Sequence, residues 1–200
     1  MYKPTLIAVT AACTLGFGTA PISATELSYT FIEGGYQDVD LDHPDADGDG
    51  FTLRASFEIT PMFHVFGGYS SSDLELSGPL GGNVDYDHWE LGAGLSYALT
   101  ERVHFVAEAS YINAEIDLAD GRIDDDGYGL YAGVRSRFHV PVQLEGGLKY
   151  VNVGDVSEDL LVKLAAHYFI TDRWATGLSL DMGDDSTTWG LNVRWQFPQR

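Results

Sequence analysis

Apolar and polar residues alternate along most of the chain after its first two dozen positions. The clearest segment runs from 51 to 60, where one face carries Phe51, Leu53, Ala55, Phe57 and Ile59. A period of two predicts β-strands, because successive side chains of a strand point to opposite faces. Ten such segments are predicted as strands: 27–37, 51–60, 64–73, 88–99, 103–115, 128–138, 142–150, 160–169, 174–183 and 188–197.

The breaks between these segments alternate in length. Breaks of three residues occur at 61–63, 100–102, 139–141 and 171–173, whereas 38–50, 74–87, 116–127, 154–159 and 184–186 are acidic and mostly longer. This alternation favours a single antiparallel ten-stranded transmembrane β-barrel, an all-β meander, over a soluble β-sandwich. The short breaks are then periplasmic turns, and the acidic breaks are extracellular loops.

Aromatic residues cluster near both ends of the predicted strands. One group lies toward the acidic breaks: Phe51, Trp89, Tyr111, Tyr128, Tyr150 and Trp189. A second group lies toward the short breaks: Tyr97, Phe105, Phe138, Tyr168, Trp174, Trp195 and Phe197. Two aromatic belts are typical of the two membrane interfaces, although strands are rich in aromatics in general.

The first 24 residues have the composition of a cleaved signal peptide. Lys3 precedes an apolar stretch over 5–20, and Ile22-Ser23-Ala24 offers a cleavage site, so we expect residues 25–200 to form the mature barrel. A membrane anchor or an acylated Cys13 are the alternatives. Export and barrel together predict the outer membrane of a Gram-negative bacterium.

The formal net charge is −19, from 30 acidic and 11 basic residues, which argues against nucleic acid as a partner. The acidic breaks and their edges hold 21 of the 30 acids. A second set of charges falls on the polar faces of strands, and in a ten-stranded barrel that face lines a narrow lumen. We expect a paired lumen network of Arg54, Glu58, Glu90, Glu108, Arg135, Arg137, Glu145, Lys149, Lys163, Asp181 and Arg194. The alternative is a narrow porin-like channel lined by the same residues.

One acidic break resembles the opening of a calcium loop. Asp45, Asp47 and Asp49 alternate with small residues and are followed by Gly50, which gives the possible Ca²⁺ ligands. The twelfth position of that pattern is Ser56 instead of a bidentate glutamate, so a solvated acidic loop is the alternative. No other cofactor is predicted.

No catalytic motif links any of the six histidines to a nucleophile or a metal. Asp184 and Asp185, with His88 at a similar height, form the best candidate for a barrel-embedded hydrolase. Paired aspartates in a polar break are usually only a turn, so we expect no enzymatic activity.

Two stretches carry a family resemblance: Ser28-Tyr29-Thr30-Phe31-Ile32-Glu33-Gly34-Gly35-Tyr36 and Phe63-His64-Val65-Phe66-Gly67-Gly68-Tyr69-Ser70, with an Asp-rich segment between them. Together they resemble the small outer-membrane β-barrel domain proteins of the porin-like and opacity-type superfamily, most of all the ten-stranded Ax-type barrels. The resemblance implies the fold and the location, and it brings no catalytic residues. One departure is that Phe197 is followed by Pro198-Gln199-Arg200, whereas such barrels usually end on an aromatic residue.

The sequence therefore predicts a non-enzymatic outer-membrane barrel with a structural, adhesive or surface-interaction role through acidic loops. The expected partners are outer-membrane lipid and lipopolysaccharide, the outer-membrane assembly machinery and an extracellular partner that the sequence does not identify. We expect a monomer.

Overall fold

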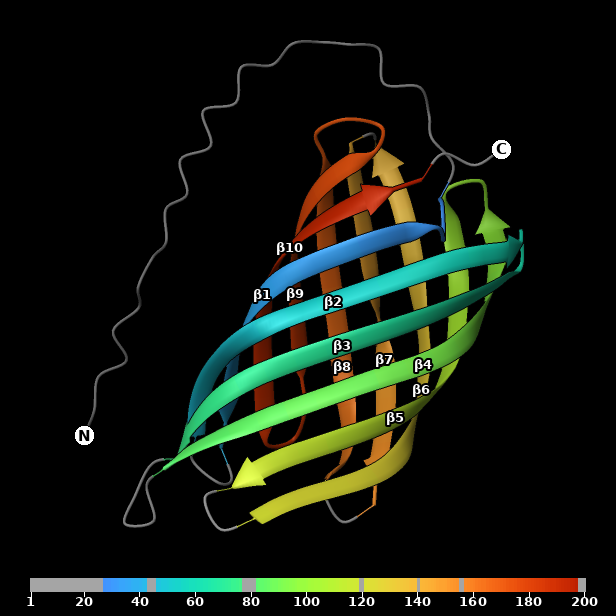
Figure 1. The fold of residues 1–200 in the computed structure, drawn as a ribbon. Helices are drawn as coiled ribbons and strands as arrows, with labels where there is room; N and C mark the ends of the chain where they lie inside the picture. Colours follow the sequence, from blue (N-terminus) through green and yellow to red (C-terminus); the bar gives the residue numbers. More distant parts are fainter. Residues whose placement is uncertain are drawn as a thin grey trace.

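The structure is a computed structural model that describes residues 27–42, 46–76, 82–118, 121–139, 141–154 and 157–197. Ten antiparallel strands in these residues form one closed barrel (Figure 1). Their bounds are β1 Phe31–Leu41, β2 Ala46–Thr60, β3 Phe63–Leu76, β4 Asn83–Thr100, β5 Val103–Leu118, β6 Gly121–His139, β7 Val142–Val153, β8 Ser157–Phe169, β9 Trp174–Met182 and β10 Ser186–Gln196.

Each strand pairs with its neighbours in the chain, and β1 pairs with β10 to close the ring. The closing register runs from Phe31 opposite Gln196 to Leu41 opposite Ser186. Closure gives every strand edge a partner, so no edge is left to pair with another chain. The ten-stranded meander predicted from the alternating pattern is confirmed. No helix in the described residues is long and apolar enough to cross a membrane.

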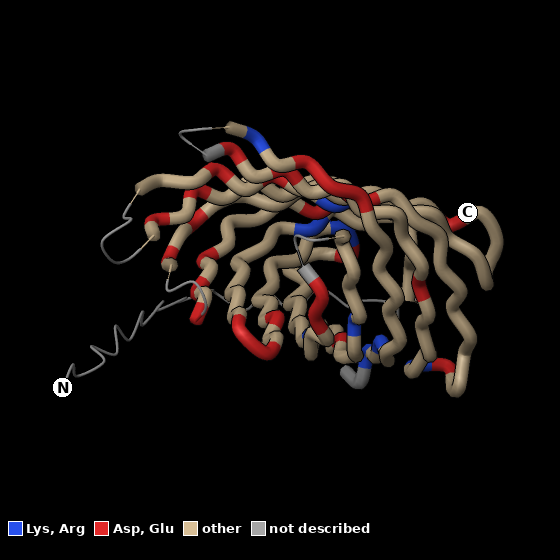
Figure 2. The backbone as a smooth tube through the Cα atoms, turned by 90° about the horizontal axis from the view of Figure 1, so that it is seen from below, with Lys and Arg blue, Asp and Glu red and all other residues tan. Residues whose placement is uncertain are grey.

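The two ends of the barrel differ in composition. We call the end with the connections β2–β3, β4–β5, β6–β7 and β8–β9 the turn end, and it lies toward the top and right of Figure 1. The opposite end, where β1 joins β2 and β9 joins β10, is the acidic end. In Figure 2, which looks at the barrel from the acidic end, acidic positions recur on neighbouring strands.

The prediction of long acidic loops is wrong in extent, because strands occupy most of those segments. β2 begins at Ala46, β4 at Asn83 and β6 at Gly121, all well inside stretches expected to be loops. Alternation continues through these stretches: Asp47 and Asp49 are exposed while Ala46 is buried. Strands persist there because the inner residues are apolar or small and the acids face water.

The outer face of the barrel changes from apolar to acidic along the strands. On β4, Leu91 and Trp89 are exposed on the outer face, and the next outward positions toward the acidic end are Asp87 and Asp85. The inner face of β4 changes from charged to apolar in the same direction, since Glu90 lies near the middle and buried Val84 near the acidic end. Along most strands, the outward-facing apolar residue nearest the acidic end is aromatic. These residues are Tyr36, Phe51, Tyr69, Trp89, Tyr111, Tyr128, Tyr150 and Trp189. These residues form the aromatic belt.

The first predicted strand begins four residues later than expected. Residues 27–30 precede β1 and have no strand pairing, yet Leu27, Ser28 and Tyr29 are all buried. Val106 and Tyr131, which face inward from β5 and β6, pack with Tyr29 in one apolar cluster. Residues 27–29 are therefore packed inside the barrel, ahead of the first strand of the wall.

Candidate functional site

The outer wall beyond the aromatic belt carries a row of aspartates on adjacent strands. Asp38 of β1 lies opposite Asp49 of β2, and the register continues to Asp73 of β3, Asp85 of β4 and Asp117 of β5. Arg122 of β6 lies opposite Asp117 and ends the row with an ion pair. We call this part of the wall the acidic collar, formed by Asp38, Asp40, Asp47, Asp49, Asp73, Glu75, Asp85, Asp87, Glu115, Asp117, Asp124 and Asp126.

Three tyrosines of the aromatic belt donate hydrogen bonds to acidic side chains on the neighbouring strand. Tyr69 donates a hydrogen bond of 2.9 Å to Asp87, and Tyr150 donates one of 2.8 Å to Glu158. Tyr111 donates to Asp126, which also accepts from the side-chain amide of Asn113. Those two hydrogen bonds lower the pKa of the Asp126 carboxyl below its ordinary value.

The segment that resembles the opening of a calcium loop belongs to β2 from Ala46 onward. Asp45 lies outside the described residues, and Asp47 and Asp49 lie on the outer face of β2. Calcium loops bend so that several oxygens converge on one ion, whereas an extended strand keeps its side chains along a line. The described residues contain no group of three or more His, Cys, Asp or Glu placed to hold a metal ion.

The lumen contains ion pairs between inward-facing residues of different strands. Arg54 contacts Glu108 at 2.8 Å, Arg135 contacts Glu145 at 2.9 Å, and Lys149 contacts Glu90 at 2.7 Å. Lys163 pairs with Asp181 on the neighbouring strand. Low-dielectric surroundings make an unpaired charge costly, so pairing allows these groups to remain inside.

The remaining members of the predicted network lie near the turn end. Arg194 Nε contacts Glu33 at 2.6 Å, and the Arg137 guanidinium lies 4.1 Å above the centre of the Phe169 ring. Glu58 is half-buried on β2, where its backbone N–H donates to Thr30. All eleven predicted residues therefore line the inner side of the wall.

Sequence reasoning missed one acid and two histidines of this network. Glu33 accepts hydrogen bonds from both Arg194 and His167, the latter at 2.8 Å. His64 contacts Glu108 at 3.0 Å, so each of these glutamates joins a histidine and an arginine. The facing of the first strand could not be fixed from its pattern, which is weak around Gly34 and Gly35. The alternation around His167 indicates an inward side chain, whereas His64 stands at the first position of its predicted strand.

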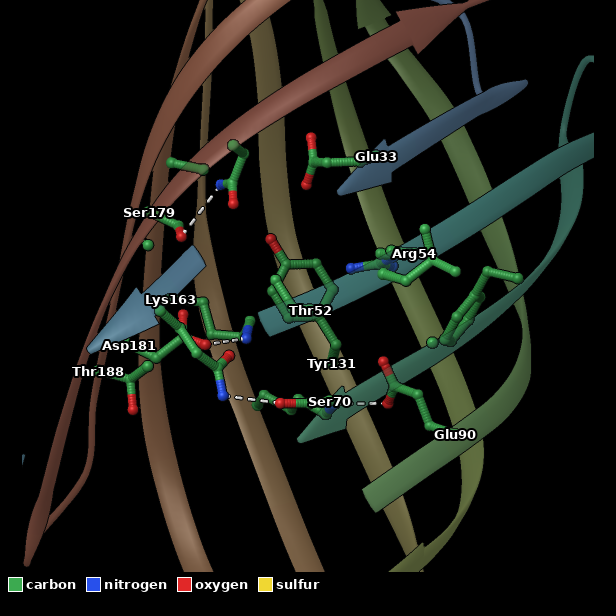
Figure 3. Close-up of a pocket in the computed structure, with 18 of the residues that line it drawn as sticks. Glu33, Thr52, Arg54, Ser70, Glu90, Tyr131, Lys163, Ser179, Asp181 and Thr188 are labelled. Atoms are coloured by element: carbon green, nitrogen blue, oxygen red, sulfur yellow. Dashed lines mark hydrogen bonds and ion pairs between the residues drawn. The ribbon is translucent and has the colours of Figure 1, made fainter. Parts of the chain in front are cut away.

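A polar cavity of about 190 Å³ lies at the centre of the lumen. Figure 3 shows Tyr131 in its middle, with Arg54 on one side and the pair of Lys163 and Asp181 on the other. The Tyr131 ring fits because Gly133 has no side chain: a Cβ there would come within 2.2 Å of the Tyr131 hydroxyl. The wall also offers hydroxyl and amide groups, which suit bound water.

Solvent exposure inside the lumen falls toward the turn end. The side chains of Lys163 and Arg54 are 29% and 25% exposed, whereas those of Arg194 and Arg135 are 5% and 1% exposed. Ile123, which faces inward at the acidic end, is 47% exposed. The side chains at the central cavity are therefore partly exposed, whereas those near the turn end are buried.

The proposed hydrolase group is not assembled. His88 faces the lumen from β4, while Asp184 and Asp185 lie in the connection between β9 and β10. β4 and β9 are five strands apart in the ring of ten, so these residues belong to opposite walls. The backbone N–H of Asp184 instead donates a hydrogen bond to Asp159 of β8. Sequence spacing could not reveal this, because the height and wall of each residue depend on the register.

Comparison with known proteins gives similarity in structure only. No protein-family model matches the chain, and no curated protein matches it in sequence. An outer-membrane channel of the COG4313 group from Pseudomonas putida F1 aligns with a TM-score of 0.54 and 13% identity, over 90% of this chain and all of the other. The NanC porin aligns with a TM-score of 0.52 and 10% identity, over 84% of this chain and all of the other. Ail, the attachment invasion locus protein of Yersinia pestis, aligns at a TM-score of 0.39 and 15% identity, over 85% of this chain and all of the other.

The alignments with the channel and with the NanC porin cover most of this chain. The identities are too low to transfer any activity, ligand or residue role. The fold supports a place in the bacterial outer membrane, since lipid-spanning strands must close into a barrel. The chain therefore has the fold of the small outer-membrane β-barrel proteins.

Proposed function

We propose that this protein is a non-enzymatic surface barrel whose acidic collar binds positively charged partners outside the outer membrane. The observation that carries the proposal is the change of the outer face from apolar to acidic at the aromatic belt. Below the belt the outer face is apolar, and above it the cross-strand row of Asp38, Asp49, Asp73, Asp85 and Asp117 faces outward. Like charges in adjacent cross-strand positions repel each other, so a cationic partner would stabilise the collar.

The short turns are periplasmic in this proposal, which places the collar among the headgroups and core sugars of the outer leaflet. Lipopolysaccharide phosphates are anionic, and divalent cations would bridge them to the collar carboxylates. The assembly machinery of the outer membrane would insert the chain, and the barrel would act as a monomer because closure satisfies every strand edge.

The lumen supports a role without steady ion conduction. Its central cations have carboxylate partners, and the turn end is closed by buried side chains. A narrow channel is the second candidate, because two of the similar structures are named as a channel and a porin. Planar-bilayer recording of the protein purified from outer membranes separates the two, since stable unitary currents from the unaltered protein would support the channel.

A matched pair of double variants tests the collar. Asp73→Asn with Asp85→Asn removes two carboxylates from the row, and Glu101→Gln with Asp172→Asn removes two exposed carboxylates from the turn end. In nanodiscs of uncharged lipid, we expect the collar variant to bind decalysine about two- to tenfold more weakly than the unaltered protein. The control should bind nearly normally, and added salt should weaken all binding. Equal affinities of both double variants would contradict the proposal.

A further inference from the structure

One aromatic side chain from the segment before β1 lies among the buried side chains at the turn end of the lumen. Tyr29 is 2% exposed, and its ring stacks on His64 with a centroid distance of 4.9 Å. The Arg135 guanidinium lies 4.6 Å from the centre of the Tyr29 ring, and the Tyr29 hydroxyl is 3.2 Å from His104 Nδ1. These contacts come from β3, β5 and β6, so the ring reaches across the lumen to several walls.

The segment is anchored where it joins the barrel. The Thr30 hydroxyl accepts a hydrogen bond of 3.0 Å from the Glu58 backbone, and the Thr30 carbonyl accepts one of 2.9 Å from Phe197. Phe31, the first residue of β1, lies under the Arg194 guanidinium at 4.1 Å. By contrast, Leu27 and Ser28 lie outside any strand. The segment is therefore tethered at Thr30 and packed only through side chains before it.

The groups around Tyr29 are polar enough to hold water in its place. Arg135 Nη1 and His64 Nδ1 are buried and have no hydrogen-bond partner among the described residues. Arg135 and Glu108 would keep their ion pairs without the ring, because Glu145 and Arg54 are their partners. Polar walls favour hydration of a gap, whereas apolar walls would favour a dry cavity or collapse.

We propose that the segment Leu27–Thr30 is a plug and that Tyr29 closes a latent ion path through the barrel. Lys163, which lines the central cavity, is 29% exposed, whereas Tyr29 and Arg135 are buried near the turn end. Displacing the ring joins the central cavity to the turn end along Arg135, His64 and His104. The path then carries ions past the paired charges of the lumen, which stay in place.

Planar-bilayer recording of Tyr29→Ala tests the plug, with Tyr29→Phe as the matched control. Both proteins are purified from outer membranes, and their folding is checked by heat-modifiable migration on gels. Tyr29→Ala should show unitary currents at least several-fold above any from the unaltered protein. Tyr29→Phe keeps the ring and should stay as quiet as the unaltered protein.

If Tyr29→Ala is not recovered in folded form, Tyr29→Val takes its place, since it keeps an apolar side chain but removes the ring. A folded Tyr29→Ala or Tyr29→Val barrel with no more current than the unaltered protein would overturn the plug. Currents of equal size from Tyr29→Phe and Tyr29→Ala would overturn it too. Steady currents from the unaltered protein would contradict the proposed function but not the plug. In that case a larger current from Tyr29→Ala would support the plug, and an equal current would contradict it.

Discussion

Tyr69 of β3 donates a hydrogen bond of 2.9 Å to the carboxylate of Asp87 on β4, and this contact joins the aromatic belt to the acidic collar. The ring of Tyr69 belongs to the apolar wall, while its hydroxyl reaches the first row of acids. Tyr150 and Glu158 repeat the arrangement on β7 and β8. An amphipathic tyrosine suits the interface because it places its apolar ring in lipid and its hydroxyl among polar groups. The contact therefore lies where the apolar outer wall gives way to the acidic collar.

Arginine substitutions on either side of the belt should have unequal costs. Leu178 faces outward on β9 and is 63% exposed, so Leu178→Arg would place a charge in hydrocarbon. We expect a loss of about 2–4 kcal/mol in the free energy of unfolding. Ser71→Arg on the collar side of Tyr69 should cost about 0–1 kcal/mol. Urea titration in detergent or lipid measures both, and equal costs would contradict the placement of the membrane.

Removing a lumen carboxylate should be strongly destabilising. Glu108 joins Arg54 and His64, so Glu108→Ala leaves the Arg54 guanidinium without its main counter-charge. We expect a loss of about 3–5 kcal/mol, measured by urea unfolding or by the temperature at which gel migration shifts. Glu101→Ala, in an exposed turn, is the control and should change stability little. A mild effect of Glu108→Ala would mean that water, and not Glu108, compensates the arginine.

One collar carboxylate, Asp126, should be protonated only at a lower pH than an ordinary aspartate. Hydrogen bonds from Tyr111 and Asn113 lower the pKa of Asp126, so the folded state binds its proton less readily than the unfolded chain. This contribution to stability is present above the ordinary pKa of aspartate and is lost as the pH falls through the lowered value. Tyr111→Phe should raise the pKa of Asp126 toward its ordinary value. Carboxyl-resolved NMR titration of the two proteins measures the shift, and an unchanged pKa would exclude Tyr111 as its cause.

Glycines on the two faces of the wall should differ in their tolerance of alanine. A Cβ at Gly133 would lie 2.2 Å from the Tyr131 hydroxyl and 2.6 Å from the Gly146 carbonyl oxygen, which is backbone. Gly133→Ala should therefore cost about 1–3 kcal/mol. At outward-facing Gly146 the nearest atom is the end of the Leu164 side chain at 3.1 Å, which can turn away. Gly146→Ala should be nearly neutral in the same unfolding assay, and similar costs at both sites would contradict the close packing of Tyr131.

The pattern of residues was enough to predict the class of fold, the number of strands and which charged side chains face the lumen. Alternation with period two shows which side chains share a face of a strand. It can be seen within each strand, without knowing which strands are its neighbours. Arg54 and Phe51 were therefore assigned to the inner and outer faces without knowledge of their neighbours, and the structure places them there. The closed ring of ten strands is also confirmed, because alternating break lengths encode a meander.

Which residues contact each other could not be predicted from the pattern, because contacts across a barrel depend on register and shear. The pairs of Glu33 with Arg194 and of Glu108 with His64 join distant parts of the sequence, and no spacing rule reports them. The same holds for the aspartate row, which one residue of slip in register would break by turning a whole strand over. Tyr29 is the clearest case: its alternating neighbours predicted a strand, yet the buried ring fills the lumen because the short segment before β1 turns into the barrel.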